Sequence, residues 1–263
     1  MYDFAYHKPS SIADAVKLLS EDPDAKPISG GMTLLPALKH RLNRPTALID
    51  LSAIAELRGV KQEGNALVIG AMTKHFEVAT NPLVMASIPA LAKMAASIGD
   101  TQVRNRGTLG GSLANNDPAA DYPSAALALG ATFITDRRSI PADDFFQGMF
   151  TTALEPGELL VAVSFPIPEK AGYAKLRNPA SRYAMTGVFV AKGPQGVRVA
   201  VNGAAACVFR QTEMEAALAA NWSADAIAGV KQSPDDLNSD IHGSAEYRAH
   251  LVNVMARRAL AEA

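Results

Sequence analysis

The sequence contains a single cysteine, Cys207, among 263 residues. One thiol cannot form an internal disulfide, a Cys-x-x-Cys redox pair or a thiolate metal cage. It also cannot hold an iron–sulfur cluster by itself, because such clusters take several cysteine ligands. The histidines show no metal-ligand spacing, so we expect no metal site and surface positions for His7, His40, His242 and His250.

The chain also has no large excess of positive or negative charge. The formal net charge is −1, so the chain has no global basic field for nucleic acid or an anionic membrane. No stretch approaches the run of about 20 apolar residues that a membrane span needs. The N-terminal segment lacks the basic and apolar regions of a signal peptide. We therefore expect a cytoplasmic protein that binds neither nucleic acid nor a membrane.

Repeats and low-complexity tracts are absent, and the composition is that of an ordinary globular protein of one or two domains. Strands and helices are mixed without the strict alternation of a doubly wound sheet, which predicts an α+β fold. The stretch "FPIPEKAG", residues 165–172, is the best candidate for a domain boundary. It divides the chain into residues 1–168 and residues 169–263. Within the second of these, residues 233–244 are expected to form a surface connection.

Helices are predicted where apolar residues recur at helical spacing or form helix-like runs, with a capping residue before the first of them. The segments with this pattern are residues 10–22, 32–42, 82–99 as a broken pair, 124–129, and a capped tail over 244–263. Strands are predicted in the short β-type runs over residues 25–28, 46–52, 66–73, 131–136, 157–168, 172–193 and 196–209. In the tail helix, we expect Leu251, Val254 and Met255 to face the core and Arg248, Arg257 and Arg258 to face solvent.

Two segments carry adjacent glycines: "KPISGGMTLLPAL", residues 26–38, and "GTLGGSLANNDPAADYPSA", residues 107–125. A Gly-Gly pair lets main-chain N–H groups approach an anion that a Cβ atom would block. Each pair is expected to follow a β-type run, and Thr33, Thr108 and Ser112 offer hydroxyl donors nearby. Neither segment is a P-loop or a Gly-x-Gly-x-x-Gly fingerprint. From the pattern alone, a tight turn is an equally good interpretation of each pair.

The stretches "ISGGMTLLPAL" and "TQVRNRGTLGGSLANNDPAAD" resemble the two flavin-binding loops of the FAD-carrying medium subunits of the molybdenum hydroxylases. The similarity extends along the chain through "YDFAYHKPSSIADAVKLL", "GAMTKH", "GELLVAVSFPIP", "GYAKLRNPASRYAMTGVFVA" and "GSAEYRAHLVNVMARRAL". Two departures are small. Ser29 stands where family members often have Ala or Gly, and Ser112 stands where they often have Asn.

The resemblance implies an FAD-binding domain of two α+β subdomains, of the molybdenum hydroxylase flavoprotein (PCMH) type, followed by a small C-terminal α+β domain. It also implies an electron-transfer role. Substrate would be oxidised on a molybdopterin-binding large subunit, and electrons would reach the FAD of this chain through the [2Fe–2S] clusters of a small subunit. The expected assembly is a dimer of such heterotrimers, with no catalytic residue on this chain.

Carried over by position, the resemblance implies that the FAD pyrophosphate is wrapped through main-chain donors of both Gly-Gly segments. Two apolar side chains would pack on the flavin faces, Ile98 on one and Leu160 or Val161 on the other. An acid and a lysine, Asp121 and Lys175, would lie near the cofactor. The full set of expected FAD-binding residues is Ile28, Ser29, Gly30, Gly31, Met32, Thr33, Ile98, Thr108, Leu109, Gly110, Gly111, Ser112, Asn115, Asp121, Leu160, Val161 and Lys175.

Several of these residues have ordinary structural alternatives. Asp117 and Asp121 are also suited to capping the helix that follows, because acids favour helix N-termini. Ile98, Leu160 and Val161 are ordinary core residues without the resemblance, and an unaligned Lys175 would be solvated. His75, in a Thr-x-His element, is equally compatible with a place near the cofactor and with a structural role. Tyr183 lies in a segment that could approach the flavin, although a core aromatic is the preferred interpretation. Arg104 and Arg106 suit phosphate, a salt bridge or a partner contact.

Three functions remain open from the sequence. The leading one is the electron-transfer subunit; the others are a self-contained flavin oxidase and an assembly module that has lost its flavin. Residues after Phe165 show no recognisable catalytic grouping, which argues against the oxidase, and intact glycines in both segments argue against loss of flavin. No dinucleotide fingerprint is present for NAD, and "AGYAKLRNPASRY" is a short connection, so we expect an electron acceptor other than NAD. The substrate of the complex is not encoded in this chain.

Overall fold

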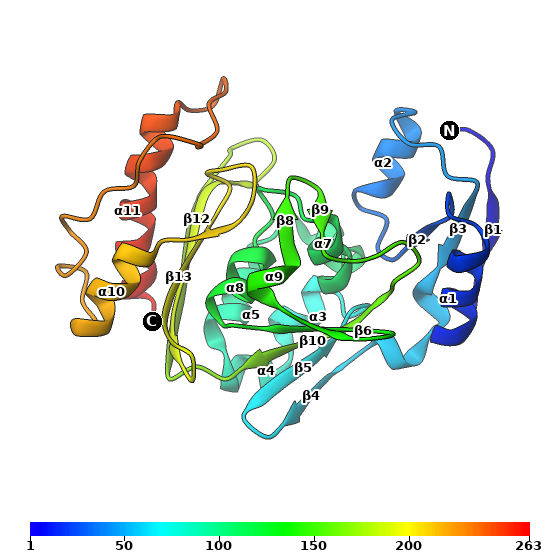
Figure 1. Ribbon diagram of the computed structural model, residues 1–263, viewed down its shortest axis with the longest axis horizontal. Coiled ribbons are helices and arrows are strands. Elements are labelled where there is room, and N and C mark those ends of the chain that lie inside the picture. The colour runs from blue at the N-terminus through cyan, green and yellow to red at the C-terminus, as the bar shows by residue number, and fades with distance from the viewer.

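The computed structural model describes all residues from Met1 to Ala263 as three successive parts, which follow one another from right to left in Figure 1. Their sheets have three, five and four strands, and a separate hairpin pairs two more. Helices and strands are mixed without regular alternation along the chain. The predicted α+β fold is therefore confirmed.

The N-terminal part is a small parallel sheet with connecting helices. Ser11 begins the first helix, because its hydroxyl accepts the N–H of Asp14 at 3.1 Å. The apolar core of this part includes Met72 and Leu159, which belong to the second part, so the two parts share one apolar contact. The sheet order is β1 (Ala5–His7), β3 (Ala47–Asp50) and β2 (Lys26–Ile28), with α1 (Ile12–Glu21), α2 (Leu34–Lys39) and the 3-10 turns η1 (Leu51–Ala53) and η2 (Ala55–Leu57).

The second part is built on an antiparallel sheet. Its order is β4 (Val60–Glu63), β5 (Ala66–Gly70), β10 (Leu160–Pro166), β6 (Thr132–Thr135) and β7 (Ser139–Pro141). Six helices lie between β5 and β6: α3 (His75–Thr80), α4 (Pro82–Ser87), α5 (Pro89–Ala96), α6 (Thr101–Arg106), α7 (Leu109–Asn115) and α8 (Tyr122–Ala128). Helix α9 (Ala142–Phe145) and the hairpin of β8 (Phe146–Gly148) and β9 (Thr151–Thr152) follow β7. The predicted broken pair over 82–99 is confirmed, since Pro82 and Pro89 each begin a helix.

The third part is a four-stranded antiparallel sheet that is covered on both faces. Strands β11 (Lys170–Arg177), β12 (Ala184–Gly193), β13 (Gly196–Asn202) and β14 (Phe209–Arg210) pair in chain order. Helices α10 (Thr212–Ala220) and α11 (Ala245–Ala261) lie on one face, and α5 and α8 of the second part lie on the other (Figure 1). Along β12, Val188 and Val190 enter the core beneath α11, whereas Phe189 and Ala191 enter the large core of the second part. Because successive side chains of β12 point to opposite faces of the sheet, one face of this strand packs against the second part.

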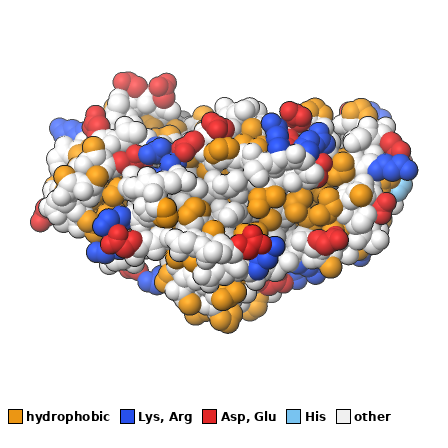
Figure 2. All heavy atoms as spheres, turned by 60° about the horizontal axis from the view of Figure 1, so that its bottom comes forward, with side chains coloured by type: hydrophobic (Ala, Val, Ile, Leu, Met, Phe, Trp, Pro, Cys, Tyr) orange, Lys and Arg blue, Asp and Glu red, His pale blue; other side chains and the backbone are white.

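Charged side chains are spread over the face that Figure 2 shows, with basic and acidic groups interspersed rather than separated by sign. This distribution agrees with the formal net charge of −1. None of the helices combines the length and hydrophobicity that crossing a membrane requires.

Two expectations about local structure are wrong. The second Gly-Gly pair does not follow a strand: α6 precedes it, and Gly110 and Gly111 lie inside the first turn of α7. Arg248 does not face solvent either. Its guanidinium is buried and donates to the carbonyl oxygens of Met185 and Gly203, and it pairs with Asp240 at 2.8 Å. An arginine with main-chain carbonyls on a neighbouring sheet can be buried, which helical spacing alone does not reveal.

We predict that Arg248→Met lowers the free energy of unfolding by about 3 kcal/mol, because it leaves two carbonyl oxygens and Asp240 without their cationic partner. The matched control is Arg257→Met on the same helix, whose side chain is exposed. Urea unfolding of both variants, followed by circular dichroism, measures the difference. Equal stabilities for the two variants would contradict the structural role of Arg248.

Candidate functional site

A cavity of about 580 Å³ lies where the three parts of the chain meet. Residues 26–34 and Leu51 of the N-terminal part line it, together with residues from α7 and the start of β10. The turn between β11 and β12 contributes residues 181–183 from the third part. The size is that of a ligand pocket, for which typical volumes are roughly 300–1,000 Å³.

The segment after β2 presents a row of free main-chain donors to this cavity. None of the N–H groups from Ser29 to Thr33 donates a hydrogen bond within the chain, and all five residues line the cavity. Gly31 has a φ of 71°, a left-handed conformation that glycine adopts readily. Consecutive N–H groups around such a residue form an anion-binding nest. The structure therefore fits an anionic group here, as the sequence predicted.

The second Gly-Gly segment does not supply main-chain donors in the same way. The N–H groups of Leu109 and Gly110 donate to the carbonyl oxygens of Thr73 and Ala71, at 2.9 and 2.8 Å. Those of the next two residues are bonded to Thr108, at its hydroxyl and its carbonyl oxygen. The N–H groups of residues 109–112 are therefore bonded within the chain, to Thr108 and to two residues that follow β5. The expected role of residues 108–112 around a pyrophosphate stays a prediction.

The glycines of both segments instead allow the segments to touch. A Cβ atom on Gly30 would lie 2.2 Å from the carbonyl oxygen of Arg106, and one on Gly111 would lie 2.5 Å from Oγ of Ser29. The hydroxyl of Thr108 donates to Ser29 Oγ at 3.2 Å across the same contact. Gly110 packs on Ala71, where a Cβ atom would come within 2.4 Å. Close packing of backbone, rather than ligand approach, explains why glycine is needed at 30 and 110.

Most of the residues expected at the site line this one cavity. Between Leu160 and Val161, the structure brings Leu160 to the cavity, whereas Val161 packs toward the N-terminal core. Leu109 is buried in the core of the second part, and Lys175 lies behind the wall. The members that line the cavity are Ile28, Ser29, Gly30, Gly31, Met32, Thr33, Ile98, Thr108, Gly110, Gly111, Ser112, Asn115, Asp121 and Leu160.

Asp121 is a buried carboxylate in the cavity wall, held by two residues of β11. Lys175 Nζ pairs with its Oδ2 at 2.8 Å, and the Tyr173 hydroxyl donates to its Oδ1. Burial raises the pKa of Asp121, and the Lys175 ammonium opposes that rise. The side chain makes no capping hydrogen bond to α8, so the helix-cap alternative is wrong for Asp121. The positive charge of Lys175 is already paired with Asp121, which limits its use as a free cation.

His75 lines the cavity as a buried, neutral imidazole. Its ring lies beside that of Tyr122, with the ring centroids 5.3 Å apart, and its Nδ1 atom has no hydrogen-bond partner in the chain. Burial, with a smaller contribution from the charge of Arg104, lowers the pKa of His75 to about 4.

The sequence analysis missed several residues of the wall. For Tyr183 the core was the preferred place and the approach to the flavin the alternative. The residue is 46% exposed and lines the cavity together with Arg182, because the turn between β11 and β12 reaches across from the third part. The guanidinium of Arg182 lies 3.4 Å from the carbonyl oxygen of Gly99. Asn43 and Phe150 also line the cavity. No local pattern marked them, since each comes from a connection whose position only the fold determines.

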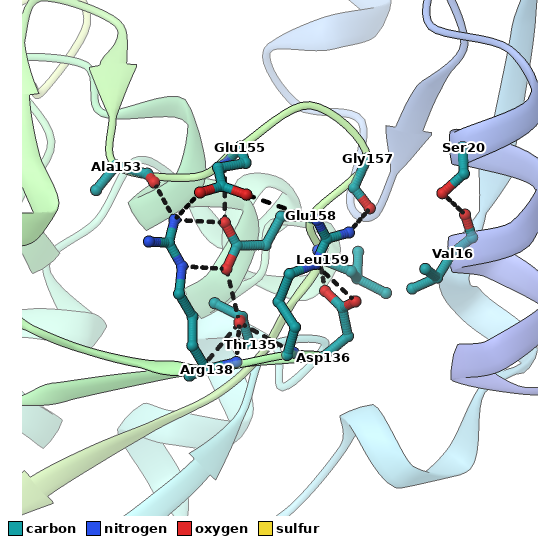
Figure 3. Close-up of polar contacts among 11 residues, drawn as sticks. Val16, Ser20, Thr135, Asp136, Arg138, Ala153, Glu155, Gly157, Glu158 and Leu159 are labelled. Atoms are coloured by element: carbon teal, nitrogen blue, oxygen red, sulfur yellow. Dashed lines mark hydrogen bonds and ion pairs between the residues drawn. The ribbon is translucent and has the colours of Figure 1, made fainter.

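Glu158, in the "GELL" stretch at the start of β10, is another missed residue. Its carboxylate is fully buried and accepts hydrogen bonds from Arg138, Thr135 and the N–H of Glu155, each at 2.8 Å (Figure 3). The Arg138 side chain holds the pKa of Glu158 down to about 2. A charged glutamate directly before a buried Leu-Leu pair is the one sequence signal that could have pointed to it.

Comparison with known proteins identifies related domains over most of the chain. Residues 2–168 match the family described as the FAD binding domain in molybdopterin dehydrogenase. Residues 182–263 match the family described as the CO dehydrogenase flavoprotein C-terminal domain.

Curated relatives align over nearly their whole length. The chain is 36% identical to the carbon monoxide dehydrogenase medium chain of Hydrogenophaga pseudoflava, over 98% of this chain and 96% of the relative. It is also 36% identical to the nicotine 6-hydroxylase medium subunit of Paenarthrobacter nicotinovorans, again over 98% and 96%.

Solved structures give the same result. Reconstituted CO dehydrogenase from Oligotropha carboxidovorans has a chain that superposes with a TM-score of 0.89 at 34% identity, covering 100% of this chain and 99% of that one. Quinoline 2-oxidoreductase from Pseudomonas putida 86 gives a TM-score of 0.85 at 33% identity, over 99% and 96%.

The depressed pKa of His75 predicts a pH dependence of stability. Its folded-state pKa of about 4 lies below the ordinary value of 6.5, so the unfolded chain takes up a proton first as the pH falls. The stability contributed by neutral His75 is present above pH 6.5 and is lost as the pH falls toward 4. Between pH 7 and pH 5 the wild type should lose roughly 2 kcal/mol more than His75→Phe. Urea unfolding at both pH values measures this, and equal losses would contradict it.

Proposed function

The chain belongs to the FAD-binding medium subunits of the molybdenum hydroxylases, and we propose that it is the electron-transfer subunit of such an enzyme. The observation that carries this proposal is the row of free N–H groups from Ser29 to Thr33, which faces a cavity of about 580 Å³ between the parts of the chain. When bound, FAD supplies the redox chemistry, and the protein supplies binding, orientation and electrostatics.

In this proposal, the nest at residues 29–33 holds the FAD pyrophosphate through main-chain N–H groups. Ile98 and Leu160, which line the cavity as apolar side chains, pack against the two faces of the flavin ring. Asp121 is fixed by Tyr173 and Lys175, so its carboxylate keeps one orientation toward the cofactor. The remaining cavity-lining members of the expected set complete the FAD-binding site. The same proposal divides the chain into an FAD-binding domain, residues 1–168, and a C-terminal domain, residues 169–263.

The partners in this proposal are a molybdopterin-binding large subunit and a small subunit that carries the [2Fe–2S] clusters, in a cytoplasmic dimer of heterotrimers. Two observations support it. Medium chains of carbon monoxide dehydrogenase and medium subunits of nicotine 6-hydroxylase are similar to this chain over nearly their full length. Cys207 is the only cysteine, so clusters with cysteine ligands belong on another chain. Substrate oxidation therefore takes place on the large subunit, and the residues that select the substrate lie there.

FAD binding to the isolated full-length chain tests the proposal directly. We predict that the flavin-free chain binds FAD, and that Gly111→Val weakens binding about tenfold or more, because its side chain would push Ser29 and the nest away from α7. Quenching of flavin fluorescence during titration measures the dissociation constant. Gly110→Val is unsuitable, because it would meet the backbone of Ala71 and disturb the fold itself.

The matched control for this titration is Gly229→Val. A Cβ atom at Gly229 meets nothing within 4 Å, and the residue lies outside the cavity. Its dissociation constant should equal that of the wild type. Full FAD affinity in Gly111→Val would refute the assignment of the nest, and absence of FAD binding by the wild type would refute the proposed function.

The electron acceptor in this proposal is not NAD. No Gly-x-Gly-x-x-Gly fingerprint is present, and the β11–β12 turn, with Arg182 and Tyr183, occupies the cavity wall on the side of the third part. We predict that NAD fails to reoxidise the flavin of the dithionite-reduced complex under nitrogen within the turnover time. Stopped-flow absorbance of the whole complex measures this. Reoxidation by NAD within that time would overturn the prediction, and a quinone provides the positive control.

A further inference from the structure

A polar network joins the turn after β6 to the segment that leads into β10 (Figure 3). The Arg138 guanidinium meets both carboxylate oxygens of Glu158 at 2.8 Å and donates to the carbonyl oxygen of Ala153 at 2.7 Å. Thr135 and the N–H of Glu155 complete the bonding of the carboxylate. The Glu158 side chain is 0% exposed, so every acceptor site on this buried charge has a donor in the chain.

The same turn also forms hydrogen bonds with the residues on either side of Glu158. Asp136 accepts the N–H of Leu159 at 2.6 Å and donates its own N–H to the Leu159 carbonyl oxygen at 3.0 Å. Arg137 donates to the carbonyl oxygen of Gly157 at 3.1 Å. Residues 157–159 are therefore fixed from one side by the second part of the molecule, through both side-chain and main-chain bonds.

On its other side, this segment enters the N-terminal part. Leu159 is a member of the N-terminal apolar core, with Leu19 and Ile49. Figure 3 places Gly157 and Leu159 opposite Ser20 and Val16 of α1. Leu159 and Leu160 also line the cavity. The segment thus connects two parts of the molecule at the point where both face the cavity.

We propose, on the basis of the proposed function, that the Arg138–Glu158 pair is a positioning device for FAD. By holding residues 157–160, it fixes the separation between the N-terminal part, which carries the nest, and the wall that carries Leu160. The two ends of the cofactor site are then kept at one distance. Arg138 lies outside the cavity lining, and the Glu158 carboxylate, although it borders the cavity, has all its acceptor sites bonded within the chain. Both residues therefore act through Leu159 and Leu160.

The test is FAD titration of the flavin-free full-length chain with wild type, Glu158→Gln and Arg138→Lys. Glu158→Gln should raise the FAD dissociation constant about tenfold, because a neutral amide cannot accept the forked guanidinium bonds. Arg138→Lys keeps the charge but loses the fork, so its rise should be smaller. The control is Glu169→Gln, an exposed carboxylate paired with Lys192 at 3.0 Å away from the cavity, which should bind FAD as the wild type does.

A second readout separates positioning from simple stability. The visible circular dichroism band of FAD-saturated Glu158→Gln should differ from that of the wild type, because the wall against the flavin has moved. Lowered thermal stability with an unchanged dissociation constant and an unchanged band would overturn the proposal. If Glu158→Gln does not fold, Thr135→Val, which removes one bond to the carboxylate, replaces it. Wild-type affinity in both Thr135→Val and Arg138→Lys would then overturn it, whereas no FAD binding by the wild type would refute the proposed function itself.

Discussion

The close contact between the two Gly-Gly segments is the constraint on which the cofactor site depends. Gly30 lies against the carbonyl oxygen of Arg106, and Gly111 lies against Ser29, so no side chain larger than hydrogen fits at either place without movement. The hydroxyl bond between Thr108 and Ser29 holds the contact. Because the N–H groups of residues 109–112 are paired within the second part, those of residues 29–33 remain the free donors. One segment therefore supports the other, and the first presents its free main-chain donors to the cavity.

Buried charges act at the borders between parts rather than at their centres. Asp121 with Lys175 and Tyr173 joins the cavity wall to the third part. Glu158 with Arg138 joins the segment that enters the N-terminal core to the turn after β6. Apolar packing is less directional than hydrogen bonding. Charge-assisted hydrogen bonds have defined lengths and angles, so they fix the geometry of the wall. The polar networks thus determine the shape of the cavity, and the apolar cores determine that the parts fold.

Expectations failed where a residue's partner is remote in sequence. Arg248 was expected to face solvent because its helix is amphipathic. Its guanidinium is instead buried, because it donates hydrogen bonds to the carbonyl oxygens of Met185 and Gly203. The core was the preferred place for Tyr183, yet the residue belongs to a turn that lines the cavity where the three parts meet. The burial of Glu158 was not predicted, because its partners Arg138 and Thr135 lie on a different hairpin. The helix around Arg248 was predicted correctly, whereas Glu158 and Tyr183 lie in connections that fall inside the strands predicted over residues 157–168 and 172–193.

The sequence by itself determined the α+β fold, most helices and strands and the family, and it predicted an anion-binding role for residues 29–33. These features depend on the spacing of apolar residues along the chain, on capping residues, and on the positions of glycines, all of which can be identified directly from the sequence. Only the tertiary structure decided that Gly110 and Gly111 serve packing, that Leu160 rather than Val161 faces the cavity, and that Lys175 is neutralised by Asp121. Such facts depend on which groups meet across long stretches of chain. A single sequence shows which side chains are present but not which of them come into contact. The distance between two side chains is set by the packing of every element between them.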